Sequence, residues 1–78
     1  MSRTATNEPM FWDLPVQAGN SLIFGPREAQ LFMMTQWAGV KDSDFAAAAK
    51  SVLNALHGRA SPDHARELFA KAIKSARL

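Results

Sequence analysis

The sequence predicts an α+β domain in which an N-terminal β-hairpin packs against three α-helices, in the order ββααα. Apolar residues alternate with other residues before the pair Gly19-Asn20, as they do in a strand that leads into a tight turn. Three later segments repeat apolar residues at the spacing of an amphipathic helix, between residues that start or stop helices. The 78 residues suffice for one small domain with a thin core, which we expect at residues 10–78. Residues 1–9 are polar and aperiodic, and we expect them to be disordered.

The first element is a hairpin whose turn fixes its register. Gly19-Asn20 supplies the positive φ angles of a two-residue turn. The first strand starts near Met10, and the second covers residues 21–24 before Gly25-Pro26 ends it. Counting outward from the turn pairs Ala18 with Ser21, Gln17 with Leu22, Val16 with Ile23 and Pro15 with Phe24.

This register leaves apolar residues on both faces of the ribbon. The face assigned to the core carries Trp12, Leu14, Val16 and Ile23. The opposite face carries Phe11, Leu22 and Phe24 among polar residues, and exposed clusters of this kind usually mark an interaction site. The outer edge of the second strand is open as well, whereas Pro15 blunts the other edge. The face of Phe11, Leu22 and Phe24, or the edge beside it, is therefore the candidate interface, most simply in an isologous homodimer. The alternative is a monomer in which the ribbon twists or the N-terminal segment covers this face.

The first helix is predicted between Pro26 and Gly39. Proline suits the first helical position, Glu28 favours the positive end of the helix dipole, and glycine suits the end of a helix. Its apolar stripe consists of Ala29, Phe32, Met33 and Trp37, widened by Leu31 and Met34. The adjacent methionines could also line an adaptable binding groove, but we assign Met33 to the core and Met34 to the edge of the stripe.

The second and third helices have clear start signals. Asp42 or Ser43 caps the second helix, and Gly58 suits the left-handed residue after its end. Ser61 caps the third helix, with Pro62 at its first position. Their stripes are Phe45, Ala49, Val52, Leu53 and Leu56 in the second helix and Ala65, Leu68, Phe69, Ala72, Ile73 and Ala76 in the third, where the alanines permit close approach. The core is expected where the inner face of the hairpin meets Phe32, Met33, Trp37, Leu53, Leu56, Leu68, Phe69 and Ile73.

Many of these residues stand in the order and spacing of a known family. In the N-terminal half they are Trp12-x-x-Pro15-Val16, Ile23, Arg27-Glu28-Ala29, Phe32, Met33 and Trp37, and in the C-terminal half they are Ala49, Ala55-Leu56-x-Gly58, Pro62, Ala65-Arg66, Phe69, Ala72 and Ala76. Over residues 11–77 the chain resembles the domain-of-unknown-function family 982, a set of short alphaproteobacterial, largely rhizobial proteins. It departs from the family pattern at Ala38, where a proline is expected, and at Val52, where a cysteine is common. The loss of that cysteine suggests that the position serves packing rather than chemistry. The resemblance supports the fold and implies no function, because the family has no established activity.

Nothing in the sequence predicts an enzyme or a cofactor site. The chain has no cysteine, its glycines stand singly, and no serine lies in a strained Gly-x-Ser-x-Gly turn. His57, His64 and Asp63 could lie near one corner, but a zinc site needs more ligands than these, each oriented by further hydrogen bonds. A domain of 8.5 kDa also has little room for a ligand pocket beside its core. We therefore expect no catalytic residue, no metal and no cofactor.

Nucleic acid is the alternative partner. The net charge is only +2, but the outer face of the last helix carries basic residues, namely Arg66, Lys71, Lys74 and Arg77. The last two predicted helices and their short connection also resemble a helix-turn-helix motif. Asp63 in the first turn of the last helix would repel phosphate, and Glu67 interrupts the basic face. A solvated helix surface is the simpler interpretation.

We expect a soluble, cytoplasmic domain that does not bind membranes. No apolar segment approaches the ~20 residues of a membrane span, and charged residues and prolines interrupt the region where a signal peptide needs an apolar core. The sequence thus predicts a small non-enzymatic interaction module that self-associates through its hairpin or, as the alternative, binds nucleic acid weakly through its last helix. It identifies no partner, and it does not decide whether the helices leave a small cleft.

Overall fold

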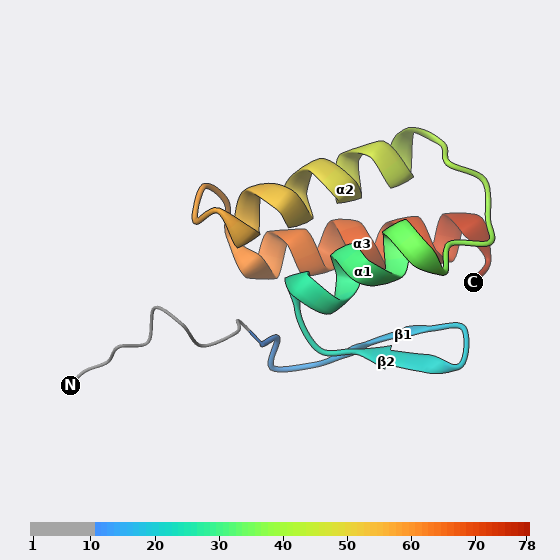
Figure 1. The fold of residues 1–78 in the computed structure, drawn as a ribbon, viewed down its shortest axis with the longest axis horizontal. Helices are drawn as coiled ribbons and strands as arrows, with labels where there is room; N and C mark the ends of the chain where they lie inside the picture. The colour runs from blue at the N-terminus through green and yellow to red at the C-terminus, as the bar shows by residue number, and fades with distance from the viewer. Residues whose placement is uncertain (1–10) are drawn as a thin grey trace.

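The computed structural model describes residues 11–78 and confirms the ββααα order (Figure 1). The elements are β1 (Val16–Ala18), β2 (Ser21–Ile23), α1 (Pro26–Thr35), α2 (Ser43–Leu56) and α3 (Pro62–Ala76). In Figure 1 the hairpin lies below the helices and α2 above, with α1 and α3 between them. The disorder expected for residues 1–9 and the strand start near Met10 fall outside the described residues. Within the described part of the chain, no helix is long and apolar enough to cross a membrane.

The predicted register of the hairpin is confirmed for three of its four pairs. β2 ends at Ile23, one residue before the predicted end, and the predicted pair of Pro15 with Phe24 is not formed. The antiparallel partners are Val16 and Ile23, Gln17 and Leu22, and Ala18 and Ser21. Gly19 has a φ angle of +59°, whereas Asn20 does not have a positive φ. This is the pattern of a type II′ turn, which needs a positive φ only at its first central residue. The expectation of positive φ at both turn residues is therefore wrong for Asn20.

The first strand is shorter than the alternation predicts, because the chain bends at Asp13 and Leu14. Two hydrogen bonds to the start of α3 hold this bend. The Trp12 indole Nε1–H donates to the Pro62 carbonyl at 2.9 Å. The Arg66 Nε–H donates to the Leu14 carbonyl at 2.6 Å. Leu14 is consequently exposed rather than part of the core, while Trp12 is buried as predicted.

The first helix ends about one turn before the predicted stop at Gly39. Beyond α1 the Trp37 ring packs edge-on against Phe32 and Phe45, at 6.1 and 4.8 Å between ring centroids. Gly39 has a different role from the predicted helix end. A Cβ at this position would lie 2.6 Å from the Cβ of Ala76, so glycine lets the connection pass close to the end of α3.

The predicted caps of α2 and α3 are confirmed. At the start of α2 the Asp42 carboxylate accepts the Phe45 N–H at 3.0 Å. At the start of α3 the Ser61 hydroxyl accepts the His64 N–H at 3.3 Å. Gly58 follows α2 with a φ angle of +72°, as a left-handed residue after a helix requires.

α2 is rotated relative to the face that its large apolar residues predict. Its buried residues are Ala48, Ser51, Val52 and Ala55. Val52 is buried as predicted, but Leu53 is exposed. The other members of the predicted stripe are half-buried, namely Phe45, Ala49 and Leu56. The buried face of α3 also contains Ala65 and Ala72. Small side chains on both helices allow α2 and α3 to pack closely, and this contact takes precedence over the burial of Leu53.

An aromatic cluster forms the centre of the core. The fully buried Phe69 packs against Trp12 at 5.9 Å and Phe32 at 6.3 Å between ring centroids. The predicted core residues that are buried are Trp12, Val16, Ile23, Phe32, Met33, Phe69 and Ile73. Those that are half-buried against this core are Trp37, Leu56 and Leu68. The hairpin is thus fixed to the helices through one face, which leaves its other face outward.

Candidate interaction surface

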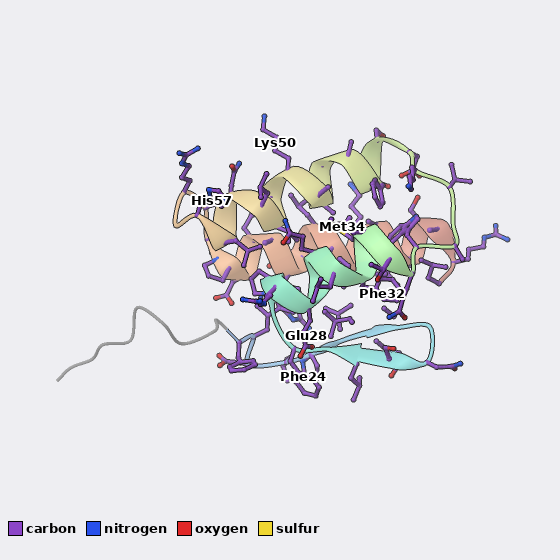
Figure 2. The ribbon with its side chains drawn as sticks, viewed as in Figure 1. Phe24, Glu28, Phe32, Met34, Lys50 and His57 are labelled. Carbon is purple, nitrogen blue, oxygen red and sulfur yellow. The ribbon has the colours of Figure 1, made fainter. Side chains whose placement is uncertain are left out.

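The hairpin face turned away from the helices carries the predicted interface residues. Phe11 is 65% exposed, Leu22 49% and Phe24 42%. Figure 2 shows the Phe24 side chain on the side of the hairpin away from the helices. The prediction that these three residues lie outside the core is therefore confirmed. We call them the hairpin patch.

The backbone of the ribbon holds the hairpin patch together. Leu22 and Phe24 lie two residues apart and therefore point to the same side of the ribbon. Ile23 between them points to the opposite side and is buried. The Trp12 N–H donates to the Phe24 carbonyl at 2.6 Å, which brings the chain at Phe11 next to the end of β2. The exposed Phe11 therefore lies in the chain beside the end of the strand that carries Leu22 and Phe24.

The outer edge of β2 is less open than the sequence suggests. In the confirmed register the N–H groups of Leu22 and Phe24 face away from β1. The Glu28 carboxylate, in the first turn of α1, accepts the Phe24 N–H at 2.9 Å (Figure 2). β2 is also only 3 residues long. An edge this short offers little to strand pairing, so the apolar face is the stronger part of the candidate surface.

A second apolar surface lies between α1 and α2, where the methionine pair had suggested a groove as the less favoured interpretation. This α1–α2 groove has a volume of about 310 Å³ and is lined by Gln30, Met33, Met34, Lys41, Phe45, Ala49, Val52 and Leu53. Met34 is 73% exposed at its wall, on the side of α1 towards α2 (Figure 2), rather than at the edge of the core stripe.

The sequence contains the pattern of the buried α2 face, but nothing local ranks this face above the one with larger residues. The buried face of α2 repeats small residues at the i, i+3, i+4 and i+7 spacing, as Ala48, Ser51, Val52 and Ala55. Because this face is buried in place of the one with larger residues, Leu53 points outward. The stripe of large residues led to the wrong prediction, because size and hydrophobicity normally indicate the buried face.

Two of the four basic residues of the predicted nucleic-acid face lie among acidic groups. Arg66 lines a surface hollow together with Asp13, Leu14, Asp63 and Glu67. Its guanidinium is also bonded to a backbone carbonyl of the N-terminal segment. Lys71 lies 3.9 Å from the Asp44 carboxylate of α2. Lys74 and Arg77 are exposed at the C-terminal end of the helix.

Among the titratable groups of the described region, Asp42 has a structural role. The Phe45 N–H and the Ser75 hydroxyl donate to the Asp42 carboxylate and lower its pKa below the ordinary 3.8. Asp42 thereby caps α2 and joins it to α3. His57 and His64 are exposed, and residues 11–78 contain no group of three or more His, Cys, Asp or Glu side chains placed to hold a metal ion.

Comparison with known proteins gives one match. The family model described as "Protein of unknown function (DUF982)" matches residues 8–78 of the chain. No curated protein and no solved structure matches it. The match confirms the resemblance noted in the sequence and, like it, assigns no activity.

Proposed function

Because the chain belongs to the DUF982 family, which is described only as proteins of unknown function, we propose its role from its own surface. It is a small non-enzymatic interaction module that self-associates through the hairpin patch of Phe11, Leu22 and Phe24. One observation carries the proposal. Three large apolar side chains remain exposed on one face of a ribbon whose other face is buried.

The energy of this association comes from removing apolar surface from water. Burial contributes roughly 25 cal/mol per Å², and aromatic rings that meet edge-on or offset add to it. Phenylalanine side chains also lose little conformational entropy on binding, because they have two rotatable bonds. The patch has three residues per copy and is smaller than a standard interface of ~1,600 Å². We therefore expect a dimer of micromolar affinity.

A two-fold, isologous contact between the two faces suits this patch. In an isologous contact the same face of each copy meets the other, so the apolar side chains of one patch pack against the same side chains of its partner. The contact through the face is favoured over pairing of the strand edges, because Glu28 already accepts the outward N–H of Phe24. Pairing through the edge would have to break that hydrogen bond.

Light scattering over a concentration series tests the proposal. The wild type is expected to rise from the mass of an 8.5 kDa monomer towards twice that value at high micromolar concentration. Phe24→Asp places a charge in the patch and should keep the protein monomeric. Met34→Asp makes the same kind of change at an exposed residue outside the patch and should behave as the wild type.

The circular dichroism of all three proteins must agree, and Leu22→Asp serves as a second patch variant should Phe24→Asp lose helix. A wild type that stays monomeric at high micromolar concentration would exclude the proposal. Equal dimerisation of wild type and both patch variants would place the interface elsewhere.

Nucleic-acid binding through Arg66, Lys71, Lys74 and Arg77 stays an alternative prediction. Two of its cations already have neighbours, because Arg66 is bonded to Leu14 and Lys71 lies near Asp44. Titration of labelled duplex DNA and of RNA at two salt concentrations decides it, because phosphate contacts weaken steeply with salt. Salt-sensitive binding that Lys74→Ala weakens would support this alternative, and no binding at low salt would remove it.

A further inference from the structure

The α1–α2 groove is independent of the hairpin patch and has the features of a small-molecule site. None of the residues that line it belongs to the hairpin. Its volume of about 310 Å³ lies at the lower end of the range for ligand sites, ~300–1,000 Å³, so the expectation that the domain has little room for a pocket beside its core is wrong. Met33 and Val52 are buried and form its floor, while the exposed Met34 and Leu53 form opposite walls.

The groove is rigid at the end formed by Phe45 and adaptable along the side formed by α1. Phe45 is held from two sides, because its ring packs on Trp37 and its backbone N–H is bound by Asp42. Along the α1 side, the unbranched side chain of the exposed Met34 can change rotamer at little cost. A flexible aliphatic chain suits such adaptable walls better than a rigid planar ligand does.

Of the residues that the structure describes, one cationic side chain lines the groove, that of Lys41. Lys41 reaches the fixed end, where its Nζ lies 5.7 Å from the centre of the Phe45 ring. Among the described residues no acidic side chain lines the groove. Asp42 is held by Ser75, and Asp44 lies beside a lysine of α3. Within residues 11–78 the ammonium of Lys41 thus has no carboxylate partner in the groove, and it favours a ligand with a negative group at this end.

We propose that the α1–α2 groove binds a free medium-chain aliphatic carboxylate. The acyl chain lies between Met34 and Leu53 over the buried floor, and the carboxylate pairs with the Lys41 ammonium beside Phe45. The apolar walls supply affinity, and the lysine selects the sign of the head group. This site is separate from self-association and does not depend on it.

NMR titration of the full chain with decanoate below its micelle concentration tests the site. Saturable shifts are expected at the amides of Met34, Lys41 and Leu53. Affinity should rise by up to about fourfold for each methylene from hexanoate to decanoate, as burial of a CH₂ group predicts. Decyltrimethylammonium, which has the same chain and the opposite charge, should bind about tenfold more weakly or worse.

Matched variants identify the groups responsible. Lys41→Glu should weaken decanoate binding by about tenfold or more, whereas Lys74→Glu on α3 should leave it unchanged. Met34→Glu, which places a charge in the wall of the groove, should also weaken decanoate binding by about tenfold or more. Leu31→Glu is its control and should leave binding unchanged, because Leu31 is an exposed residue of the same helix that does not line the groove.

The substituted residues are exposed, so these variants keep the fold. Equal affinity for the cationic amphiphile would overturn the proposal. So would shifts confined to the hairpin patch, a lack of saturation, or binding to anionic phospholipid vesicles without binding to monomeric decanoate.

Discussion

Ser51 carries a hydroxyl group into the buried face of α2. It is 7% exposed, and its Oγ has no hydrogen-bond partner in the described part of the chain. A buried hydroxyl without a partner costs about 1–3 kcal/mol, and serine is also a weaker helix former than alanine. Two alanines, Ala48 and Ala55, already stand on the same face. At this residue the sequence is not optimised for stability.

Ser51→Ala should therefore stabilise the domain by about 1 kcal/mol. Urea unfolding followed by circular dichroism measures this as a higher midpoint with an unchanged slope. Ser43→Ala, at the exposed first residue of α2, is the control and should change stability by less than about 0.5 kcal/mol. A loss of stability in Ser51→Ala would mean that the hydroxyl makes a bond in solution.

Gly39 is a second residue whose role depends on one neighbour. A methyl group there collides with the Ala76 side chain, so Gly39→Ala should cost about 1–3 kcal/mol. The double variant Gly39→Ala, Ala76→Gly removes the collision. The double variant should lose less unfolding free energy than the two single variants lose together, as measured by a double-mutant cycle. Strict additivity would show that the two residues are not in contact.

At the scale of the elements, features set by residues near in the chain were predictable, and features set by distant residues were not. The caps at Asp42 and Ser61 bind N–H groups three residues away, so their side chains indicate the helix starts directly. The bend at Leu14 depends on a hydrogen bond to Arg66, at the other end of the chain. The rotation of α2 likewise depends on the alanines of α3.

The same distinction separates the two candidate surfaces. The hairpin patch results from a turn at Gly19 and the alternation of side chains along a strand, so local reasoning places it. The α1–α2 groove results from the choice of the α2 face that meets α3, and no local signal ranks the alanine face above the leucine face. For this reason the sequence placed Leu53 in the core, whereas it lines the groove.

The cap of α2 predicts a pH dependence of stability. The Phe45 N–H and the Ser75 hydroxyl lower the pKa of Asp42 in the folded state below the ordinary 3.8. The folded state thus favours the charged form. The charged Asp42 carboxylate contributes its full stabilisation above pH 3.8, and this stabilisation is lost as the pH falls through the lowered pKa.

Asp42→Asn keeps an acceptor for the Phe45 N–H but cannot titrate. The melting temperature of the wild type minus that of Asp42→Asn should be constant at higher pH and should fall below pH 3.8. Thermal melts of both proteins from neutral pH to about pH 3 measure it. A difference that stays constant in acid would contradict the role of the charged carboxylate.

At the scale of the whole molecule, one aromatic residue connects the layers. Phe69 contacts Trp12 from the N-terminal segment and Phe32 from α1, and it is fully buried. Because one face of the hairpin is used for this core, the other face is left for contacts outside the chain. The exposure of the hairpin patch is a consequence of how so small a domain forms its core.

Phe69→Ala should remove a large fraction of the stability of the domain and lower its melting temperature strongly. The substitution removes about 3–5 kcal/mol. A domain of this size has a total stability of about 4–12 kcal/mol. The expected result is a large loss of helical circular dichroism on mild heating. Cooperative melting near the wild-type temperature would show that the core is centred elsewhere.

Isotope-filtered NOE spectroscopy on a mixture of labelled and unlabelled protein tests the self-association of the hairpin patch most directly. At high micromolar concentration we expect NOEs between the rings of Phe11 and Phe24 in one copy and the methyl groups of Leu22 in the other. Intermolecular NOEs from Met34 or Leu53 instead, or none at a concentration where the protein is a dimer, would contradict an interface on the hairpin.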